Sequence, residues 1–311
     1  MARPENRVLV YDVGGSHISA AVFDRDGCTV QGVVTEGHPS EQSIDSFFNV
    51  LHSLGTRAAQ GQADIQGVSI AMPGPFDYER GVSWMQHKLP YLYGFDLRKA
   101  LAERFGVPEF RVRFLNDAAA YLLGEIAAGS ARGVDRVVGI TLGTGIGSAF
   151  AVGGHVIREG TGVPSGGEIW NFPYQGGILE DQISTRAIRQ SYQLRTGEDR
   201  EVAAIATSAA QDAIAAEVFS DFGRTLGTAF RAVLAAFGPQ VIVLGGGISR
   251  SAQLFLQAAQ AELDSPHIEL RVSLLGEIAP LVGAGAAWCD TEDCVSPTAD
   301  DPGTHAVAKP N

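Results

Sequence analysis

The first part of the chain alternates short apolar runs with polar turns. The run RVLVYDV from Arg7 and the run HISAAVFD after it each predict a buried strand. The following DRDGCTV predicts a tight turn into a third strand, because Asp-Gly is a common hairpin turn. Apolar residues then recur at steps of three and four between Glu41 and Ala59, and GVSIAM forms one more apolar run. The pattern therefore predicts an antiparallel meander, a helix with one buried face and a further strand.

A similar order of elements returns at Arg136. The stretch RVVGITLGTGIGSAFAVGGHVI again predicts a strand, a glycine-rich turn, a strand, a glycine turn and a strand. When Arg136 is aligned with Arg7, Gly143 falls on Gly14. The repeat predicts an internal duplication, with two similar lobes that face one another across a cleft.

The second half of the chain supplies three more predicted elements. Residues 209–237 are rich in Ala, Leu and Phe, which predicts one long helix or two abutting ones. The stretch QVIVLGGGISR predicts a strand, a glycine turn and a helix start with Ser249 as the N-cap. Residues 281–289 predict a final helix.

These elements predict an α/β fold, and 311 residues are enough for two lobes. We expect a small α/β lobe over residues 1–116, completed by the helix at 281–289, and a large α/β lobe over residues 117–280. Residues 290–311 are acidic and show no periodicity, so we expect a flexible tail there.

Charge and cysteine content exclude several classes of protein. The formal net charge of -12 argues against a nucleic-acid groove, which needs clustered Lys and Arg. The 3 cysteines are too few and too scattered for a disulfide framework or a four-ligand zinc site. No apolar run approaches the roughly 20 residues that span a bilayer, and the start of the chain lacks the apolar core of a signal peptide. We therefore expect a cytoplasmic protein that binds neither membrane nor nucleic acid.

Three glycine-rich turns follow three predicted buried strands. Glycine allows positive backbone φ and lets a ligand approach the backbone N–H groups closely, which a polyphosphate needs. Each turn alone could be a tight hairpin, but three at strand ends favour phosphate binding. None has the spacing of a P-loop or of the GxGxxG dinucleotide motif. The turns are Gly14-Gly15-Ser16, Gly143-Thr144-Gly145 and Gly245-Gly246-Gly247.

Polar residues follow two of the predicted strands. Asp12 ends the first strand in front of a glycine turn, where it would repel a phosphate unless a cation lies between them. We expect Asp12 to hold Mg²⁺ through water, and hydrogen bonding to the turn is the alternative. Asn116 and Asp117 lie between a strand and a helix, where an amide can fix a hydroxyl beside a carboxylate that accepts its proton. The alternative for Asp117 is an N-cap.

Taken together, these segments resemble the ROK family of sugar kinases and repressors, within the actin-like ATPase superfamily. The resemblance runs from Val8 to about Trp288 and rests on five segments in order: DVGGSHISAAVFD, AMPGPFD, LNDAAAYLLGE, LGTGIGSAF and VIVLGGGIS. It implies a two-lobed actin-like ATPase (ribonuclease H-like) fold with a central cleft. It also implies ATP and Mg²⁺ as cofactors, a sugar and a nucleotide as small-molecule partners, and a homodimer.

The resemblance implies transfer of the γ-phosphoryl group of ATP to a hexose hydroxyl, the 6-hydroxyl as in glucokinases. Asp117 falls on the family's catalytic base and Asn116 on its sugar-binding partner. Glu168 and Glu180 fall on carboxylates that hold ring hydroxyls, although Glu168 could be a surface acid and Glu180 a charge at a helix N-terminus. The implied sugar site also includes Pro73 and Gly74 of the PGxxD turn. After this turn, His87 and Lys88 could line the cleft or belong to an ordinary loop.

The sequence departs from the family pattern at one important position. Asn171 stands where many members carry a His that binds zinc and sugar, and no cysteine cluster follows, so we expect no zinc site. The pattern is closer to the zinc-free branch, so a polyphosphate-dependent glucokinase or glucomannokinase is an alternative, as is a non-catalytic sugar-binding protein. A repressor would need a DNA-binding helix-turn-helix, and only six residues precede Arg7, so we expect none.

Overall fold

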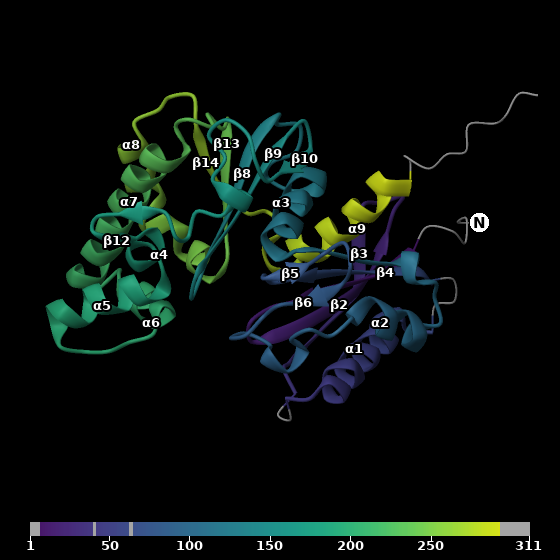
Figure 1. Cartoon of the computed structure of the whole chain (residues 1–311). Coiled ribbons are helices and arrows are strands. Elements are labelled where there is room, and N and C mark those ends of the chain that lie inside the picture. The colour runs from purple at the N-terminus through teal and green to yellow at the C-terminus, as the bar shows by residue number, and fades with distance from the viewer. Residues whose placement is uncertain (1–6, 40–41, 62–64, 293–311) are drawn as a thin grey trace, which may run out of the picture.

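The computed structural model describes residues 7–39, 42–61 and 65–292. Two five-stranded sheets form its framework (Figure 1). The first sheet has the order β3-β2-β1-β4-β7, with β1 (Arg7–Val13), β2 (His17–Asp24), β3 (Thr29–Gly37), β4 (Ile65–Met72) and β7 (Val112–Asn116). The second has the order β10-β9-β8-β13-β14, with β8 (Arg136–Leu142), β9 (Ile146–Val152), β10 (His155–Ile157), β13 (Val241–Gly245) and β14 (Glu269–Val272).

The two sheets have the same topology. In each, the first three strands in the chain are antiparallel neighbours, and two later strands extend the sheet in parallel. The equivalent strands β1 and β8 begin at Arg7 and Arg136, the two residues that the sequence alignment superimposes. This shared topology is what the predicted internal duplication requires.

Helices and short hairpins complete the fold. The hairpins are β5 (Phe76–Asp77) with β6 (Val82–Ser83), and β11 (Pro173–Tyr174) with β12 (Gly177–Ile178). The α-helices are α1 (Ile44–Ala59), α2 (Leu97–Phe105), α3 (Asp117–Ala128), α4 (Leu179–Gln182), α5 (Thr185–Thr196), α6 (Val202–Ser208), α7 (Ala213–Leu234), α8 (Leu256–Leu263) and α9 (Ala279–Glu292). The 3₁₀ helices are η1 (Pro90–Leu92), η2 (Glu109–Arg111), η3 (Ser165–Gly167), η4 (Gly247–Leu254) and η5 (Gly276–Ile278).

Several helix boundaries differ from the predicted ones for local reasons. The Ser43 side chain accepts a hydrogen bond from the backbone N–H of Ser46, so α1 begins at Ile44. The Asp212 side chain accepts the N–H groups of two residues in the first turn of α7, so this long helix starts later than predicted, after the separate helix α6. The Ser249 N-cap prediction is wrong, because η4 begins at Gly247 and the Ser249 hydroxyl donates to the Gly246 carbonyl from inside that helix.

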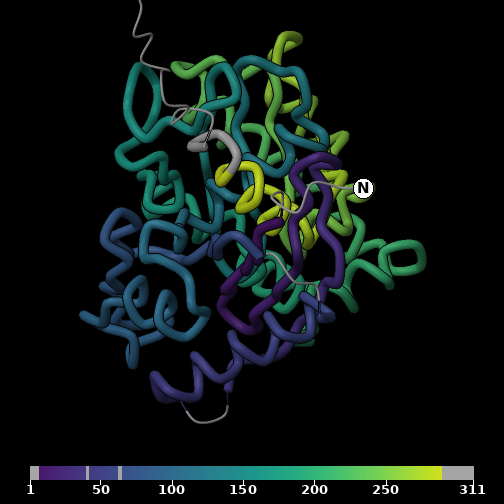
Figure 2. The backbone as a smooth tube through the Cα atoms, turned by 90° about the vertical axis from the view of Figure 1, so that its right-hand side faces the viewer, coloured from purple at the N-terminus to yellow at the C-terminus, as the bar shows by residue number. Residues whose placement is uncertain are grey.

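The C-terminal helix α9 packs against strands from the start of the chain. It contacts β1, β2 and β4, and Figure 2 shows the yellow helix beside the purple N-terminal strands. Leu281, Val282 and Trp288 are buried there with Val8 and Phe23. Helix α9 extends past the predicted 281–289, and the predicted tail at 290–311 lies outside the described residues from 293 onward. The lobe boundaries at 116 and 280 stay a prediction.

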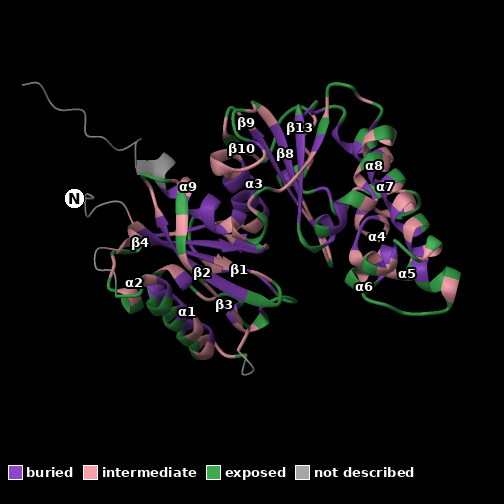
Figure 3. Cartoon of the chain, turned by 180° about the vertical axis from the view of Figure 1, so that it is seen from behind, coloured by how far each residue is buried: buried purple, intermediate pink, exposed green. Residues whose placement is uncertain are grey.

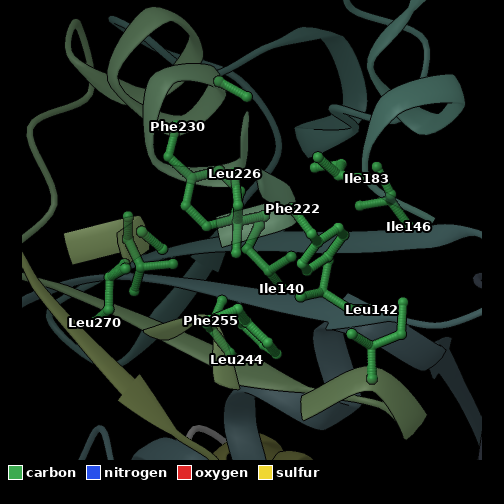
Figure 4. Packing of buried hydrophobic residues seen from close by; sticks show 14 of the residues in the cluster. Ile140, Leu142, Ile146, Ile183, Phe222, Leu226, Phe230, Leu244, Phe255 and Leu270 are labelled. Atoms are coloured by element: carbon green, nitrogen blue, oxygen red, sulfur yellow. The ribbon is translucent and has the colours of Figure 1, made fainter. Parts of the chain in front are cut away.

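Buried strands are covered by helices whose outer faces are exposed (Figure 3). The outer face of the first sheet packs against α1 and α2, and the outer face of the second sheet packs against α7 and its neighbours. Figure 4 shows Phe222, Leu226 and Phe230 of α7 packed over Ile140 and Leu244 of the second sheet. Of the described helices, none alone is long and apolar enough to cross a bilayer, although α6 and α7, bent by 117°, meet both criteria as a pair.

Helices α3 and α9 lie between the two sheets and pack against each other. Glycines make this close approach possible. A Cβ atom at Gly283 would lie 1.8 Å from the carbonyl oxygen of Ala120, and one at Gly124 would lie 2.0 Å from that of Ala279. The helix axes can therefore approach only while both positions lack a side chain.

We expect Gly283→Ala to lower the free energy of unfolding by about 1–3 kcal/mol, the usual cost of overpacking a tight contact. The added methyl group must push α9 away from the Ala120 carbonyl. Urea unfolding measures the loss, and Ala286→Ser, at a partly exposed position of the same helix, serves as the control. An unchanged unfolding midpoint would contradict the tight α3–α9 contact.

Candidate active site

The carboxyl ends of three parallel strands bring the predicted acidic residues to one edge of the first sheet. Asp12 in β1 pairs with Ala71 in β4, and Met72 at the end of β4 pairs with Asn116 at the end of β7. Ligands of parallel α/β sheets bind at this edge, because the loops and helix N-termini that follow the strands converge there. Asp12, Asn116 and Asp117 therefore share one edge.

The N-terminus of α3 holds Asp117 by one carboxylate oxygen. The Asn116 side-chain oxygen accepts the N–H of Ala119 at 3.0 Å, so Asn116 is the N-cap, and the N-cap alternative for Asp117 is wrong. The Asn116 amide nitrogen and the N–H of Ala118 both donate to Oδ1 of Asp117, at 3.0 and 2.9 Å. Both donors reach Oδ1, so Oδ2 is the oxygen that we expect to accept a substrate proton.

Burial and neighbouring charges shift the pKa values of Asp12 and Asp117. Burial raises the pKa of Asp117, while the charge of Lys88 and hydrogen bonds from Ala118, from the backbone of Asp117 itself and from Asn116 lower it. Burial, together with the charge of Asp117, raises the pKa of Asp12 to about 7. Lys88 is therefore one of the charges that act on the base, but its side chain is exposed, so its role in lining the cleft stays a prediction.

Asp12 suits a bridging cation. None of the described residues donates a hydrogen bond to its carboxylate, and the nearby negative charge of Asp117 disfavours its ionised form. A hard divalent cation favours carboxylate oxygen and would relieve this repulsion. Within the described ranges, no three His, Cys, Asp or Glu residues are grouped to hold a metal ion. This arrangement fits Mg²⁺ that takes its other ligands from water and phosphate.

The first glycine turn follows Val13, the residue after Asp12 and the last of β1. The N–H of Gly14 donates to the His17 carbonyl at 3.0 Å, which closes the turn between β1 and β2. The Gly14 carbonyl pairs with Nε2 of His38 at 2.8 Å, and the Ser16 hydroxyl pairs with Nδ1 of His17 at 2.8 Å. Gly15 is exposed, and a Cβ atom there would have no neighbour within 4 Å, so this turn is open to a ligand.

The second and third glycine turns lie side by side at the carboxyl end of the second sheet. Gly143 donates to the Gly145 carbonyl at 3.1 Å, and Gly245 pairs with the residue at 141 in β8. Gly246 has φ +80°, and a Cβ atom there would lie 2.4 Å from the Leu142 carbonyl oxygen, so only glycine fits. At Gly247 the corresponding space is open.

The two predicted sugar-binding glutamates have different surroundings. Glu168 accepts the indole N–H of Trp170 at 2.9 Å, and its charge helps raise the pKa of Tyr78. Oε2 of Glu180 accepts the N–H of Ile146 at 2.9 Å, so Glu180 is bound to the end of the second glycine turn. Asn171 is exposed in the segment between them. The sugar-binding roles of all three stay predictions.

The structure adds Tyr78 and Arg158, which the sequence motifs did not indicate. The Tyr78 hydroxyl accepts a hydrogen bond from the Asn116 amide at 3.2 Å and donates to the Met72 carbonyl at 3.1 Å. The Arg158 guanidinium lies 5.2 Å from the centre of the Tyr78 ring. A Cβ atom at Gly74 would lie 3.6 Å from the Tyr78 hydroxyl, so the turn after the buried Pro73 is part of the same group.

A recess opens beside the second glycine turn at Thr144. Its volume is about 370 Å³. Arg189 in its wall binds both carboxylate oxygens of Asp199, at 2.9 and 2.8 Å. Arg186 pairs with Asp181. The lining residues are Thr144, Thr185, Arg186, Arg189, Gln190, Gln193 and Asp199.

Comparisons with known proteins match this fold over most of the chain. A glucokinase of Thermotoga maritima is 27% identical over 275 residues, 81% of this chain and 85% of that protein. The ROK hexokinase of Thermus thermophilus has a TM-score of 0.75 and 28% identity, covering 92% of this chain and 99% of that one. A ROK family glucokinase of Streptomyces griseus, solved with glucose and AMPPNP, has a TM-score of 0.74 and 24% identity, covering 90% and 98%.

The sequence model of the ROK family matches residues 8–291, which includes the whole span that the resemblance covers. The two-sheet α/β architecture is shared with solved ROK kinases of the actin-like ATPase fold. The chain therefore belongs to the ROK family.

Proposed function

We propose that this protein is a sugar kinase that transfers the γ-phosphoryl group of ATP to a hydroxyl of a hexose, with Asp117 as the general base. The observation that carries the proposal is the setting of Asp117. Its carboxylate is held through Oδ1 at the N-terminus of α3, beside Asp12 and in a ROK-family chain. A general base needs this combination of a fixed orientation and a free oxygen.

In the proposed reaction, Oδ2 of Asp117 accepts the hydroxyl proton while the sugar oxygen attacks the γ-phosphorus in line. The bond from the γ-phosphorus to the bridging oxygen breaks, so the products are a sugar phosphate and ADP. Asp12 would hold Mg²⁺ through water, and that ion supplies charge neutralisation on the phosphates when bound. Backbone N–H groups of the glycine turns would position the triphosphate, and positioning carries most of the rate effect.

The donor is proposed to be ATP, with its nucleoside in the recess beside Thr144. The recess continues from the second glycine turn, and its Gln190 and Gln193 can hydrogen-bond a base or ribose. Its arginines are paired with acids: Arg189 with Asp199 and Arg186 with Asp181. The walls are thus close to charge balance, whereas a polyphosphate chain favours a net positive track.

The acceptor is proposed to be a neutral hexose, phosphorylated at the 6-hydroxyl. The glucokinase and hexokinase relatives make glucose the first candidate. The charge of Glu168 acts on Tyr78, whose hydroxyl bonds Asn116 beside the base. The Glu168 carboxylate can accept hydrogen bonds from two ring hydroxyls. Asn171 can donate to or accept from a hydroxyl but does not titrate, so the preference among hexoses can differ from that of members with a His there.

A coupled kinase assay tests the proposal. Glucose, mannose, fructose, N-acetylated hexosamines and short oligosaccharides are each paired with ATP or with polyphosphate. We expect turnover with ATP and at least one hexose, with polyphosphate much weaker. Turnover with polyphosphate alone would favour the polyphosphate glucokinase alternative, and sugar binding without turnover would favour a non-catalytic sugar-binding protein. The homodimer and the cytoplasmic location stay predictions.

A further inference from the structure

We infer that Tyr78 is a positioning residue that fixes the base through Asn116, and that Arg158 holds the Tyr78 ring in place from the side of the second sheet. The inference rests on the proposed function, since it concerns how Asp117 is oriented for proton transfer. Tyr78 and Arg158 both lie outside the five sequence segments that carry the family resemblance.

The hydrogen bonds around Asn116 form a directed chain. Its side-chain oxygen must accept the N–H of Ala119, so its nitrogen faces the other way. That nitrogen has two hydrogens, and they reach Oδ1 of Asp117 at 3.0 Å and the Tyr78 hydroxyl at 3.2 Å. Without the hydroxyl, one N–H would lose its acceptor, and the amide would be held on one side only.

The Tyr78 hydroxyl is itself anchored. It donates to the Met72 carbonyl at 3.1 Å, at the end of β4. Burial, the largest effect, raises the pKa of Tyr78 to about 12, so the phenol stays protonated and keeps this donor. The chain therefore runs from the backbone of β4 through Tyr78 and Asn116 to the base.

Aromatic packing fixes the position of the ring. The centre of the Tyr78 ring lies 5.2 Å from that of Phe76, and the centre of the Phe76 ring lies 5.0 Å from that of Phe114. Phe114 belongs to β7, the strand that ends at Asn116. Tyr78 is thus linked through Phe76 to the strand that carries its hydrogen-bond partner, and these tilted ring contacts restrict its rotation.

Arg158 reaches this ring from the other sheet. It follows β10, the edge strand of the second sheet, and its guanidinium lies 5.2 Å from the Tyr78 ring centre. Among the described residues, no carboxylate forms an ion pair with Arg158. Its guanidinium group instead contacts the face of the Tyr78 ring. A cation over an aromatic face is attracted by the ring quadrupole. This contact links the second sheet to the orientation of the base.

Tyr78→Phe tests the inference, because it keeps the ring and removes only the hydroxyl. We expect kcat to fall about tenfold, the scale of one lost hydrogen bond. KM for glucose and for ATP should change less than about twofold, since the ring, the recess and the glycine turns are intact. Tyr93→Phe is the matched control, because Tyr93 is 52% exposed and packs on Trp84; its kcat should not change.

A double-mutant cycle separates positioning from a general structural effect. If Tyr78 acts through Asp117, then Tyr78→Phe should lower kcat less than about twofold in the Asp117→Asn background. Arg158→Gln in the otherwise native protein should lower kcat about two- to fivefold through the lost ring contact.

Several results would overturn the inference. An unchanged kcat in Tyr78→Phe, or a loss equally large in the Asp117→Asn background, would remove Tyr78 from the positioning role while leaving the proposed function intact. An unchanged kcat in Arg158→Gln would remove Arg158 from it. Full activity of Asp117→Asn itself would instead overturn the proposed base, and the positioning role with it.

Discussion

Asp117→Asn is expected to lower turnover by at least about a hundredfold while sugar binding stays measurable, which is the scale of lost general-base catalysis. The amide has nearly the same shape as the carboxylate, and its oxygen can still accept the N–H of Ala118. It cannot accept the hydroxyl proton. Coupled-assay kcat, with calorimetric titration of the sugar, measures the two properties separately.

A second aspartate provides the control for this substitution. Asp45 lies in the first turn of α1, and its side chain is 87% exposed. Asp45→Asn removes the same charge from the first turn of a different helix, where Asp45 pairs with Arg104, and we expect turnover to stay within about twofold of the native value. Near-native turnover in Asp117→Asn would show that another group accepts the proton.

The strands that open each repeat and the long helices could be predicted from sequence because their signals are local and repeated, whereas the order of strands within each sheet was not predicted. The apolar runs after Arg7 and Arg136 predicted β1 and β8 at their observed starts. The glycine turns were also visible, since glycine at a strand end usually marks a tight turn or a backbone that a ligand approaches closely. Ser249 misled the prediction because its hydroxyl bonds the carbonyl at 246 from within a 3₁₀ helix, a choice that local sequence does not reveal.

The parts of the site that sequence could not supply depend on contacts between distant residues. Tyr78 meets Asn116 only because β4 and β7 are neighbours, and nothing at either position marks the pair. Glu180 carries a motif signal for sugar binding, yet it also binds the N–H of Ile146 at the second glycine turn. A carboxylate at a strand end could be recognised from sequence, but its hydrogen-bond partners could not.

Asp12→Asn should have the second large effect: it should lower turnover and raise the stability of the metal-free protein. Turnover is expected to fall about a hundredfold or more, the usual scale when one electrostatic contributor to the transition state is removed. In metal-free protein at pH 8, the same variant should be more stable. Burial and the charge of Asp117 raise the pKa of Asp12 to about 7, so its ionised form is costly there.

The sign of the pH dependence follows from linkage. Between the ordinary pKa of an Asp near pH 4 and the raised value near pH 7, the folded state binds more protons than the unfolded state. The free energy of unfolding therefore falls as pH rises through this window, and the native Asp12 loses stability that Asn at the same position keeps. The advantage of Asp12→Asn should be full at pH 8 and vanish near pH 4.

Thermal unfolding in EDTA at pH 5 and pH 8 measures this difference without relying on activity. A rise of about 3 °C or more in melting temperature is expected at pH 8, since ~1 kcal/mol shifts the melting temperature of a domain of about 150–250 residues by about 2–4 °C and that of a longer chain by somewhat less. Asp45→Asn controls for the loss of one negative charge and should show no such pH-dependent gain. If Asp12→Asn were no more stable at pH 8 than the native protein, the ionised carboxylate of Asp12 would not destabilise the metal-free fold, and the proposal that it needs a bound cation would fail. A loss of turnover without the gain in stability would then point to a hydrogen-bonding role at the first glycine turn.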